Sequence, residues 1–504
     1  MGLELRGITK RFPGVLANDG VDLTVAKGEI VALLGENGAG KTTLMNILYG
    51  LYTPSSGQVL IDGEERRFSG PGDAIAAGIG MVHQHFMLVP VFTVAENVIL
   101  GDEPTKRFGW LDKRRARKTV REISSHYGLD VDPDAVVEDL PVGIQQRVEI
   151  IKVLEREARF VIFDEPTSVL TPSEVEGFFR IVEGLKADGK GIVFISHKLG
   201  EAMEIADRIV IMRRGRTVAE VLPSEIDEER LAELMVGRPV ELEVHREEAK
   251  PGAVVLSVAD LVVLDDRNQR VVDGVSFEVR AGEIVGIAGV QGNGQTELVE
   301  SITGLRPSVH GMVRLLDEDI TTRSPRAIHR RRVAHVPEDR LGSGLILAFT
   351  VTENIVLGSY YESPISRGIQ MDWDEARARA GRLVEQYDVR TPSAEVLVST
   401  LSGGNQQKVI VAREFDRDIR LIVAAQPTRG IDVGSIEYVH SRIVEARDQG
   451  VAVLIVSSEL EEILALSDRV LVMFRGRLAA EFDDSVTATE CGLAMLGETA
   501  SGPS

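Results

Sequence analysis

An internal repeat constrains this chain more than any other feature. Three segments of the first half return in the second half, in the same order. They are GEIVALLG at 28–35, which becomes GEIVGIAG at 282–289; QQRV at 145–148, which becomes QQKV at 406–409; and DEPT at 164–167, which becomes AQPT at 425–428. Repetition of an ordered set of segments over this distance predicts two homologous domains in tandem.

The limits of the two domains follow from where the apolar periodicity stops. Pro239, a run of glutamates and Pro251-Gly252 interrupt it near the middle of the chain. We therefore predict a first domain over 1–238, a linker over 239–252 and a second domain over 253–504. The last stretch, from about Thr487 to Ser504, ends in small polar residues and is expected to fray.

Each half is predicted to be an α/β domain. Short apolar runs at 30–34, 160–163 and 192–195 are typical of buried parallel strands. Amphipathic stretches between them favour helices. Alternating strands and helices predict a parallel sheet with helices on its faces.

Composition excludes several classes of protein. The chain has no run of about 18 apolar residues, so no membrane span is expected, and its first residues lack the pattern of a signal peptide. Its single cysteine, Cys491, cannot form an internal disulfide and fits a reducing, cytoplasmic compartment. The net charge of −21 argues against a nucleic-acid partner, which requires a basic surface.

A phosphate-binding loop follows the first predicted strand. Its pattern is GENGAGKT, a P-loop in full, between an apolar strand and a predicted helix. Backbone N–H groups of such a loop surround phosphates, the lysine neutralises them, and the hydroxyl of the last residue binds Mg²⁺. The predicted nucleotide-binding residues here are Gly35, Glu36, Asn37, Gly38, Ala39, Gly40, Lys41, Thr42 and Thr43.

Two carboxylates end the strand predicted at 160–163. Asp164 suits Mg²⁺, and Glu165 suits the base that activates an attacking water. The same pair could be an ordinary acidic strand end, but the upstream P-loop makes that interpretation a minor one. His197 ends another apolar strand, where a lone histidine is more often structural than catalytic.

Phe12 and the two histidines that flank Gln84 could have either functional or packing roles. Phe12 could stack on an adenine ring or belong to the core. Gln84 lies between His83 and His85. With one cysteine in the chain, these two histidines are a poor metal site, and we interpret them as packing or surface residues.

Taken together, these marks and their order resemble the ATP-binding domains of ABC transporters over essentially the whole chain. The resemblance implies that each half has a RecA-like core, a small antiparallel β-subdomain and a helical subdomain. It implies ATP and Mg²⁺ as cofactors, with Mg²⁺ held by Thr42, Gln84 and Asp164. It also implies that Gln84 senses the γ-phosphate and that His197 contacts it beside the catalytic Glu165.

Tandem fusion without membrane spans is similar to the ATPase subunits of bacterial ribose, galactose and xylose importers. HQHFMLVP at 83–90, GVQGNGQT at 289–296 and AQPTRG at 425–430 resemble the nucleoside-importer branch of that group. The resemblance implies a peripheral protein on the cytoplasmic face of the cell membrane. Two permease subunits would contact it after Gln84 and after Glu338, and an extracytoplasmic solute-binding protein would act indirectly. A simple sugar remains an alternative cargo, because other subunits select the solute.

The second half departs from the family pattern at its nucleotide-binding motifs. Gln295 replaces the P-loop lysine, Ala425 and Gln426 replace the two carboxylates, Glu338 replaces the Q-loop glutamine and Ser458 replaces the histidine. Each change removes a charge or a donor that phosphoryl transfer uses. This half is not expected to hydrolyse ATP with its own motifs.

The first half departs from the pattern elsewhere. Its signature segment reads LPVGI at 140–144, where the family has LSGGQ, whereas the second half keeps LSGGN at 401–405. Because ABC domains pair head to tail, the resemblance implies one complete ATP site. Its P-loop, Asp164 and Glu165 come from the first half. The opposing signature residues come from the second half and are Ser402, Gly403, Gly404 and Asn405.

Two other classes compete with the transporter interpretation. A tandem ABC protein that acts on ribosomes or nucleic acid usually keeps both sites and has a longer, charged or basic linker, unlike the short acidic one here. A P-loop kinase would have no use for duplicated signature segments. Both are weaker hypotheses.

Overall fold

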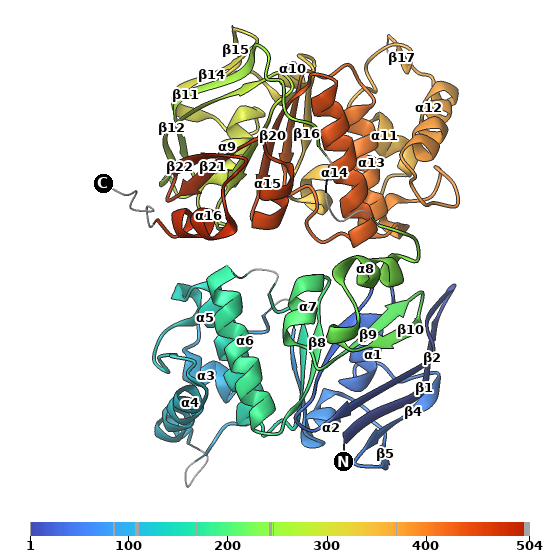
Figure 1. Cartoon of the computed structure of the whole chain (residues 1–504), viewed down its shortest axis with the longest axis vertical. Helices are drawn as coiled ribbons and strands as arrows, with labels where there is room; N and C mark the ends of the chain where they lie inside the picture. The colour runs from blue at the N-terminus through green and yellow to red at the C-terminus, as the bar shows by residue number, and fades with distance from the viewer. Residues whose placement is uncertain are drawn as a thin grey trace. The chain divides into compact units, whose positions relative to one another are not determined.

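The computed structural model describes residues 2–83, 86–105, 110–167, 170, 172–240, 244, 246–368 and 370–497. The chain divides into two compact units, Met1–Val240 and Glu241–Ser504, called domain 1 and domain 2 below. Both are α/β domains, as predicted (Figure 1). No helix in the described part of the chain combines the length and apolar character that a membrane crossing needs.

The described residues of domain 1 form two sheets. Its strands are β1 (Gly2–Phe12), β2 (Val15–Ala26), β3 (Ile30–Leu34), β4 (Ser56–Ile61), β5 (Glu64–Arg66), β6 (Ile79–Val82), β7 (Phe160–Asp164), β8 (Gly191–Ile195), β9 (Arg208–Arg213) and β10 (Arg216–Val221). A four-stranded antiparallel sheet has the order β2-β1-β4-β5. A six-stranded sheet has the order β10-β9-β3-β8-β7-β6 and is parallel except at its β10 edge. The apolar runs predicted as strands are β3, β7 and β8.

The helices of domain 1 begin at recognisable signals. They are α1 (Lys41–Leu48), α2 (Pro71–Ala76), α3 (Val94–Val98), α4 (Lys113–Tyr127), α5 (Val142–Glu155), α6 (Pro172–Ala187), α7 (Leu199–Ile205) and α8 (Glu228–Val236). Thr93 and Glu96 form a reciprocal capping box at the start of α3. Asp112 caps α4, which ends at Gly128 in the left-handed conformation, φ 62°.

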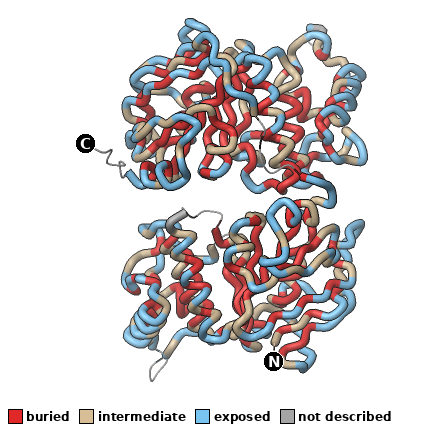
Figure 2. The backbone as a smooth tube through the Cα atoms, in the orientation of Figure 1, coloured by how far each residue is buried: buried red, intermediate tan, exposed pale blue. Residues whose placement is uncertain are grey.

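Alternating side chains place the core of domain 1 on both faces of the six-stranded sheet. Phe160 and Ile162 of β7 pack with apolar residues of the antiparallel sheet and of α1. Val161 and Phe163 pack on the other face with residues of α3, α4, α5 and α6. Strands buried on both faces are typical of parallel sheets, and Figure 2 shows the central strands as the most buried part of the domain.

Domain 2 repeats this plan. Its strands are β11 (Val254–Leu264), β12 (Arg270–Arg280), β13 (Ile284–Ala288), β14 (Ser308–Leu315), β15 (Glu318–Asp319), β16 (Val333–Val336), β17 (Ser366–Arg367), β18 (Gln370–Met371), β19 (Leu421–Ala425), β20 (Ala452–Ser457), β21 (Arg469–Phe474) and β22 (Arg477–Asp483). The antiparallel sheet has the order β12-β11-β14-β15, and the larger sheet β16-β19-β20-β13-β21-β22. The β17–β18 pair has no counterpart among the described strands of domain 1.

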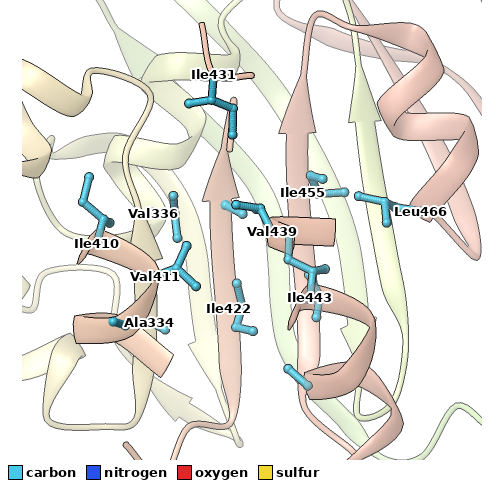
Figure 3. Packing of buried hydrophobic residues seen from close by; sticks show 14 of the residues in the cluster. Ala334, Val336, Ile410, Val411, Ile422, Ile431, Val439, Ile443, Ile455 and Leu466 are labelled. Atoms are coloured by element: carbon cyan, nitrogen blue, oxygen red, sulfur yellow. The ribbon is translucent and has the colours of Figure 1, made fainter. Parts of the chain in front are cut away.

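Most helices of domain 2 pack against the larger sheet. They are α9 (Gln295–Ile302), α10 (Pro325–His329), α11 (Val351–Val356), α12 (Trp373–Gln386), α13 (Gly403–Phe415), α14 (Val433–Asp448), α15 (Leu460–Leu466) and α16 (Ala488–Met495). Figure 3 shows Val411 of α13 and Val439 of α14 beside Ile422 of β19 in one apolar cluster. The capping box at α11, Thr350 with Glu353, repeats that of α3.

Part of the proposed linker is fastened to domain 2. The guanidinium of Arg447, which is 1% exposed, donates to Asp468 at 2.9 Å and to the carbonyl of Glu247 at 3.0 Å. Arg246 donates to the same carboxylate at 2.8 Å. Residues 246 and 247 are therefore held by ion pairs and hydrogen bonds rather than spanning freely between the domains.

The expectation of a frayed stretch from Thr487 is wrong for its first part. Thr487 and Glu490 form a capping box at the start of α16, and Cys491 is fully buried. The capping pattern and the buried positions of this segment outweigh its small polar composition. Residues 498–504 lie outside the described part of the chain.

Candidate functional site

The predicted P-loop lies between β3 and α1. Gly40 has φ 101°, and a Cβ atom there would meet the carbonyl of Ala17 and the Asn18 amide, so only glycine fits. The Asn18 amide donates to the carbonyl of Gly40 at 3.1 Å. Strand β2 of the antiparallel sheet therefore buttresses the loop at the point where α1 begins.

Lys41 is the first residue of α1, and its side chain folds back over the loop. Its Nζ donates to the carbonyls of Gly35 at 2.5 Å and Glu36 at 3.1 Å, and the residue is 6% exposed. A helix N-terminus and a buried ammonium group together favour an anion such as phosphate.

Asp164 ends β7 at the same edge of the sheet. Burial, and to a smaller extent the neighbouring charge of Glu165, raise the pKa of its carboxyl to about 6, although Lys41 opposes both effects. Because Lys41 affects the pKa of Asp164, these two residues lie close enough for their charges to interact. A carboxylate whose negative charge is so little compensated by protein groups is suited to binding a cation.

Glu165 has an unusual backbone conformation, φ 49°, and its N–H donates to the carbonyl of Ile195 at 3.0 Å. Its Oε1 lies 3.4 Å from Nδ1 of His197. Burial acts to raise the pKa of Glu165, but His197 and Lys41 lower it below its ordinary value. The carboxyl is therefore ionised, as a general base must be.

Phe12 lies at the end of β1 and is 36% exposed, not part of the core. Its ring packs edge-on against Tyr52 with centroids 5.5 Å apart, and Nζ of Lys10 lies 5.2 Å from its centroid. Tyr52 and Lys10 had no motif to mark them in the sequence. The three side chains form an exposed aromatic and cationic surface.

Gln84 and His85 lie outside the described residues. His83 packs edge-on against Tyr49 at 5.6 Å between centroids, and burial together with Lys152 lowers its pKa. No group of three or more His, Cys, Asp and Glu side chains arranged for a metal ion occurs among the residues the structure describes.

A second buried network supports the edge of the site in domain 1. Oγ1 of Thr167 donates to Glu201 at 2.5 Å, and Oγ of Ser196 donates to the same oxygen at 3.3 Å. Thr167 follows the carboxylate pair and Ser196 precedes His197, so Glu201 connects the loops that carry them. Its position on α7 gave no signal in the sequence.

The equivalent positions of domain 2 keep the backbone but lose the charges. Gln426 has φ 48°, almost the value of Glu165, and its Oε1 accepts from the N–H and hydroxyl of Ser458 at 3.2 Å each. The Gln295 amide donates to the carbonyl of Val290 at 3.2 Å, the loop position that corresponds to Glu36. Ala425 ends β19 with no side chain that can bind a metal ion.

The retained signature segment begins helix α13. Ser402 is the exposed N-cap, and its hydroxyl accepts from the Asn405 side chain at 2.9 Å. A Cβ atom on Gly404 would meet Ser435 and Asp432, and one on Gly403 would lie 3.0 Å from the Arg340 guanidinium. The glycines thus let α13 pack closely, and the hydroxyl and helix N-terminus remain available to an anion.

The altered signature segment begins helix α5 in domain 1. Pro141 is its N-cap and supplies no side-chain capping hydrogen bond, and Val142 is 45% exposed. A proline ring and an isopropyl group thus stand where domain 2 presents Ser402 and Gly403. This helix start offers fewer donors to a phosphate.

Comparison with known proteins agrees with this geometry. The family model described as ABC transporter matches residues 18–168 and 272–429. The nucleoside import ATP-binding protein NupA of Lactococcus lactis is 50% identical over 98% of both chains. The guanosine import ATP-binding protein NupO of Bacillus subtilis is 49% identical over 99% of this chain and 98% of its own.

Two further matches have lower sequence identity to this chain. The ribose import ATP-binding protein RbsA 1 of Rubrobacter xylanophilus is 42% identical over 99% of both chains. Among solved structures, archaeal ribosome recycling factor aABCE1 in complex with the stalk protein aP1 matches 95% of this chain and 90% of its own, with a TM-score of 0.62 and 21% identity. That last likeness shows the fold alone.

The chain belongs to the ABC transporter family, as an ATP-binding protein with two fused ATPase domains. Proteins of this class are ATPases that drive transport.

Proposed function

We propose that this chain is the ATP-hydrolysing subunit of a membrane importer whose solute is a nucleoside. The observation that carries the proposal is the ionised Glu165 beside His197, at the sheet edge that also holds the P-loop and Asp164. Two relatives that match nearly the full length and are about half identical are named for nucleoside and guanosine import.

The proposed roles in domain 1 follow from the chemistry of each group. Lys41, the P-loop N–H groups and the N-terminus of α1 bind the β- and γ-phosphates. Glu165 accepts the proton of a water that attacks the γ-phosphorus as the bond to ADP breaks. His197 holds the carboxylate and contacts the γ-phosphate. Phe12, with Tyr52 and Lys10, is the proposed adenine surface.

Mg²⁺ is the proposed metal cofactor. Thr42, Asp164 and Gln84 would hold it, and it would compensate the charge of the phosphate oxygens. The fit rests on the position of Asp164, whose carboxylate ends β7 close enough to Lys41 for the two charges to interact. The residue is only partly exposed, and a bound cation would compensate its charge there.

We further propose that the signature segment of domain 2, Ser402–Asn405, completes the ATP site of domain 1. The exposed Ser402 hydroxyl at the start of α13 supports this role, because it can donate to a γ-phosphate. The alternative partner segment, with Pro141 and Val142, lacks that donor. One catalytic site per chain follows.

The proposed partners are two permease subunits, which contact the chain after Gln84 and after Glu338. Large apolar side chains are exposed in both segments: Met87, Val91 and Phe92 in the first, and Leu341 and Leu347 in the second. In domain 1 a cavity of about 240 Å³ lies beside Met87. Exposed apolar patches of this kind mark protein interfaces. We therefore place the chain on the cytoplasmic face of the cell membrane, with an extracytoplasmic solute-binding protein in the same system and no nucleic-acid partner.

A simple sugar is the second candidate solute, because a relative named for ribose import is 42% identical. Uptake of labelled nucleosides and labelled pentoses by cells lacking this subunit distinguishes the two. We expect nucleoside uptake to be lost and to return with the native chain but not with Glu165→Gln. Loss of pentose uptake alone would move the protein to the sugar group, and unchanged uptake of both would contradict the proposed transport role.

A further inference from the structure

Glu338 of domain 2 has both carboxylate oxygens occupied by groups of its own domain. It follows β16, and its side chain is 18% exposed. Its Oε2 accepts from Oγ1 of Thr296 at 2.8 Å. Its Oε1 accepts from the Arg429 guanidinium at 2.8 Å and from the Gln291 amide at 3.2 Å.

Two of the three partners of Glu338 lie in the second P-loop segment, whose counterpart in domain 1 is proposed to bind the phosphates and Mg²⁺. Thr296 is the second residue of α9 and corresponds in the repeat to Thr42, the proposed Mg²⁺ ligand. Gln291 lies in the second P-loop at the position of Asn37. Arg429 follows β19, just after the pair that corresponds to Asp164 and Glu165. The carboxylate thus engages the groups that phosphate and metal ion would otherwise use.

The other polar groups of this degenerate site are also engaged internally. The Gln295 amide donates to the carbonyl of Val290, and Gln426 accepts from Ser458. Similar bonds join Lys41 to Glu36 and Glu165 to His197 in domain 1, so the distinguishing feature of domain 2 is the Glu338 carboxylate, which a phosphate at this loop would meet at close range. Two negative charges so close together repel one another. No P-loop lysine is present to offset that repulsion.

We propose that Glu338 is a built-in substitute for the nucleotide in domain 2. Its carboxylate closes the degenerate site and ties the segment after β16 to α9 and to Arg429, whether or not ATP is bound elsewhere. In domain 1 the corresponding position is Gln84, which under the proposed function would contact the Mg²⁺ bound with the nucleotide. In domain 2 the segment after β16 instead stays bonded to α9 and Arg429 whether or not nucleotide is present. This inference concerns domain 2 alone and is independent of the transported solute.

Photolabelling with 8-azido-ATP and Mg²⁺, followed by peptide mapping of the full chain, tests whether the degenerate site is closed. Because the azido group is on the adenine, we expect labelled peptides from the domain 1 surface around Phe12 and Tyr52 and none from β11, the domain 2 strand that corresponds to β1. Lys41→Gln is the matched variant, because domain 2 itself carries glutamine at that position, and it should reduce the total label strongly. Label on a β11 peptide, in the native chain or in this variant, would overturn the proposal.

A thermal double-mutant cycle tests whether the network forms in solution. Glu338→Gln and Arg429→Gln should each lower the Tm of domain 2. The Tm of the double variant should be no lower than that of the less stable single variant. Glu318→Gln removes an ion pair with Arg331 on the antiparallel sheet and serves as the control. Its effect should add to that of Arg429→Gln. Additive shifts for Glu338 and Arg429, or no shift from either, would rule the network out.

Discussion

Nδ1 of His197 lies 3.4 Å from Oε1 of Glu165 in domain 1. The residue that replaces this histidine in domain 2, Ser458, instead donates to Gln426. The two backbones are nearly the same at the base position, with φ 49° at Glu165 and φ 48° at Gln426. Domain 2 has therefore kept the scaffold of a hydrolytic site while losing the ionisable pair.

The repeat supplies a matched pair of variants for the signature segment. Ser402→Arg places a bulky side chain at the start of α13 and removes the hydroxyl proposed to contact the γ-phosphate. We expect kcat for ATP to fall by about 100-fold or more, the loss typical when a transition-state donor is removed. Pro141→Arg, at the equivalent position in domain 1, should change kcat far less. Steady-state ATPase assays check both, and equal effects would contradict a site completed by domain 2.

Restoring one residue should not revive domain 2. Gln295→Lys returns the P-loop ammonium group, but Ala425 still cannot bind a metal ion and Gln426 still cannot accept a proton. We expect the number of ATP molecules hydrolysed per chain and per second to stay at the native value. A doubled turnover would show that domain 2 can hydrolyse ATP without a carboxylate pair.

Much of this site could be predicted from the sequence, because its motifs are local. The P-loop, the strand that ends at Asp164 and the changes at Gln295 and Gln426 were all visible as short patterns. Asn18, Tyr52 and Glu201 were not, since each reaches the site from a separate element through tertiary packing and carries no motif. The same limit applies to Glu338, where the sequence showed a lost glutamine but not the bonds that the new carboxylate makes.

The fold could be predicted from the sequence to a similar extent. Buried strands such as β3 and β7 have the continuous apolar runs that parallel sheets require. The end of the chain was misjudged because the composition of its last residues hid the capping box of Thr487 and the buried Cys491. The fastening of Arg246 to Asp468 was equally hidden, since an ion pair between residues so far apart leaves no local pattern.

Domain 2 should lose stability in mild acid through His335. Burial, with a smaller contribution from Arg413, lowers its pKa to about 4 although Glu414 opposes this effect, and its Nε2 has no hydrogen-bond partner among the described residues. The folded domain therefore holds a neutral imidazole, whereas the unfolded chain binds a proton below about pH 6.5. The stability from this group is complete above pH 6.5 and is lost as the pH falls towards 4, a change on the order of 1–3 kcal/mol.

Thermal unfolding between pH 7.5 and 4.5 measures this dependence. His335→Gln should flatten the fall in Tm over that range, whereas His310→Gln, on the exposed face of β14, should leave it as steep as in the native chain. Parallel curves for the native chain and His335→Gln would show that other groups cause the acid sensitivity.

The central claim is that one site, in domain 1, drives nucleoside import. It is tested most directly by ATP hydrolysis and nucleoside uptake of the transporter reconstituted in lipid vesicles, with Glu165→Gln and Gln426→Ala as a matched pair. We predict that Glu165→Gln lowers both activities by about 100-fold or more while ATP still binds, and that Gln426→Ala leaves both close to native. Equal losses in the two variants, or uptake that survives Glu165→Gln, would contradict the claim.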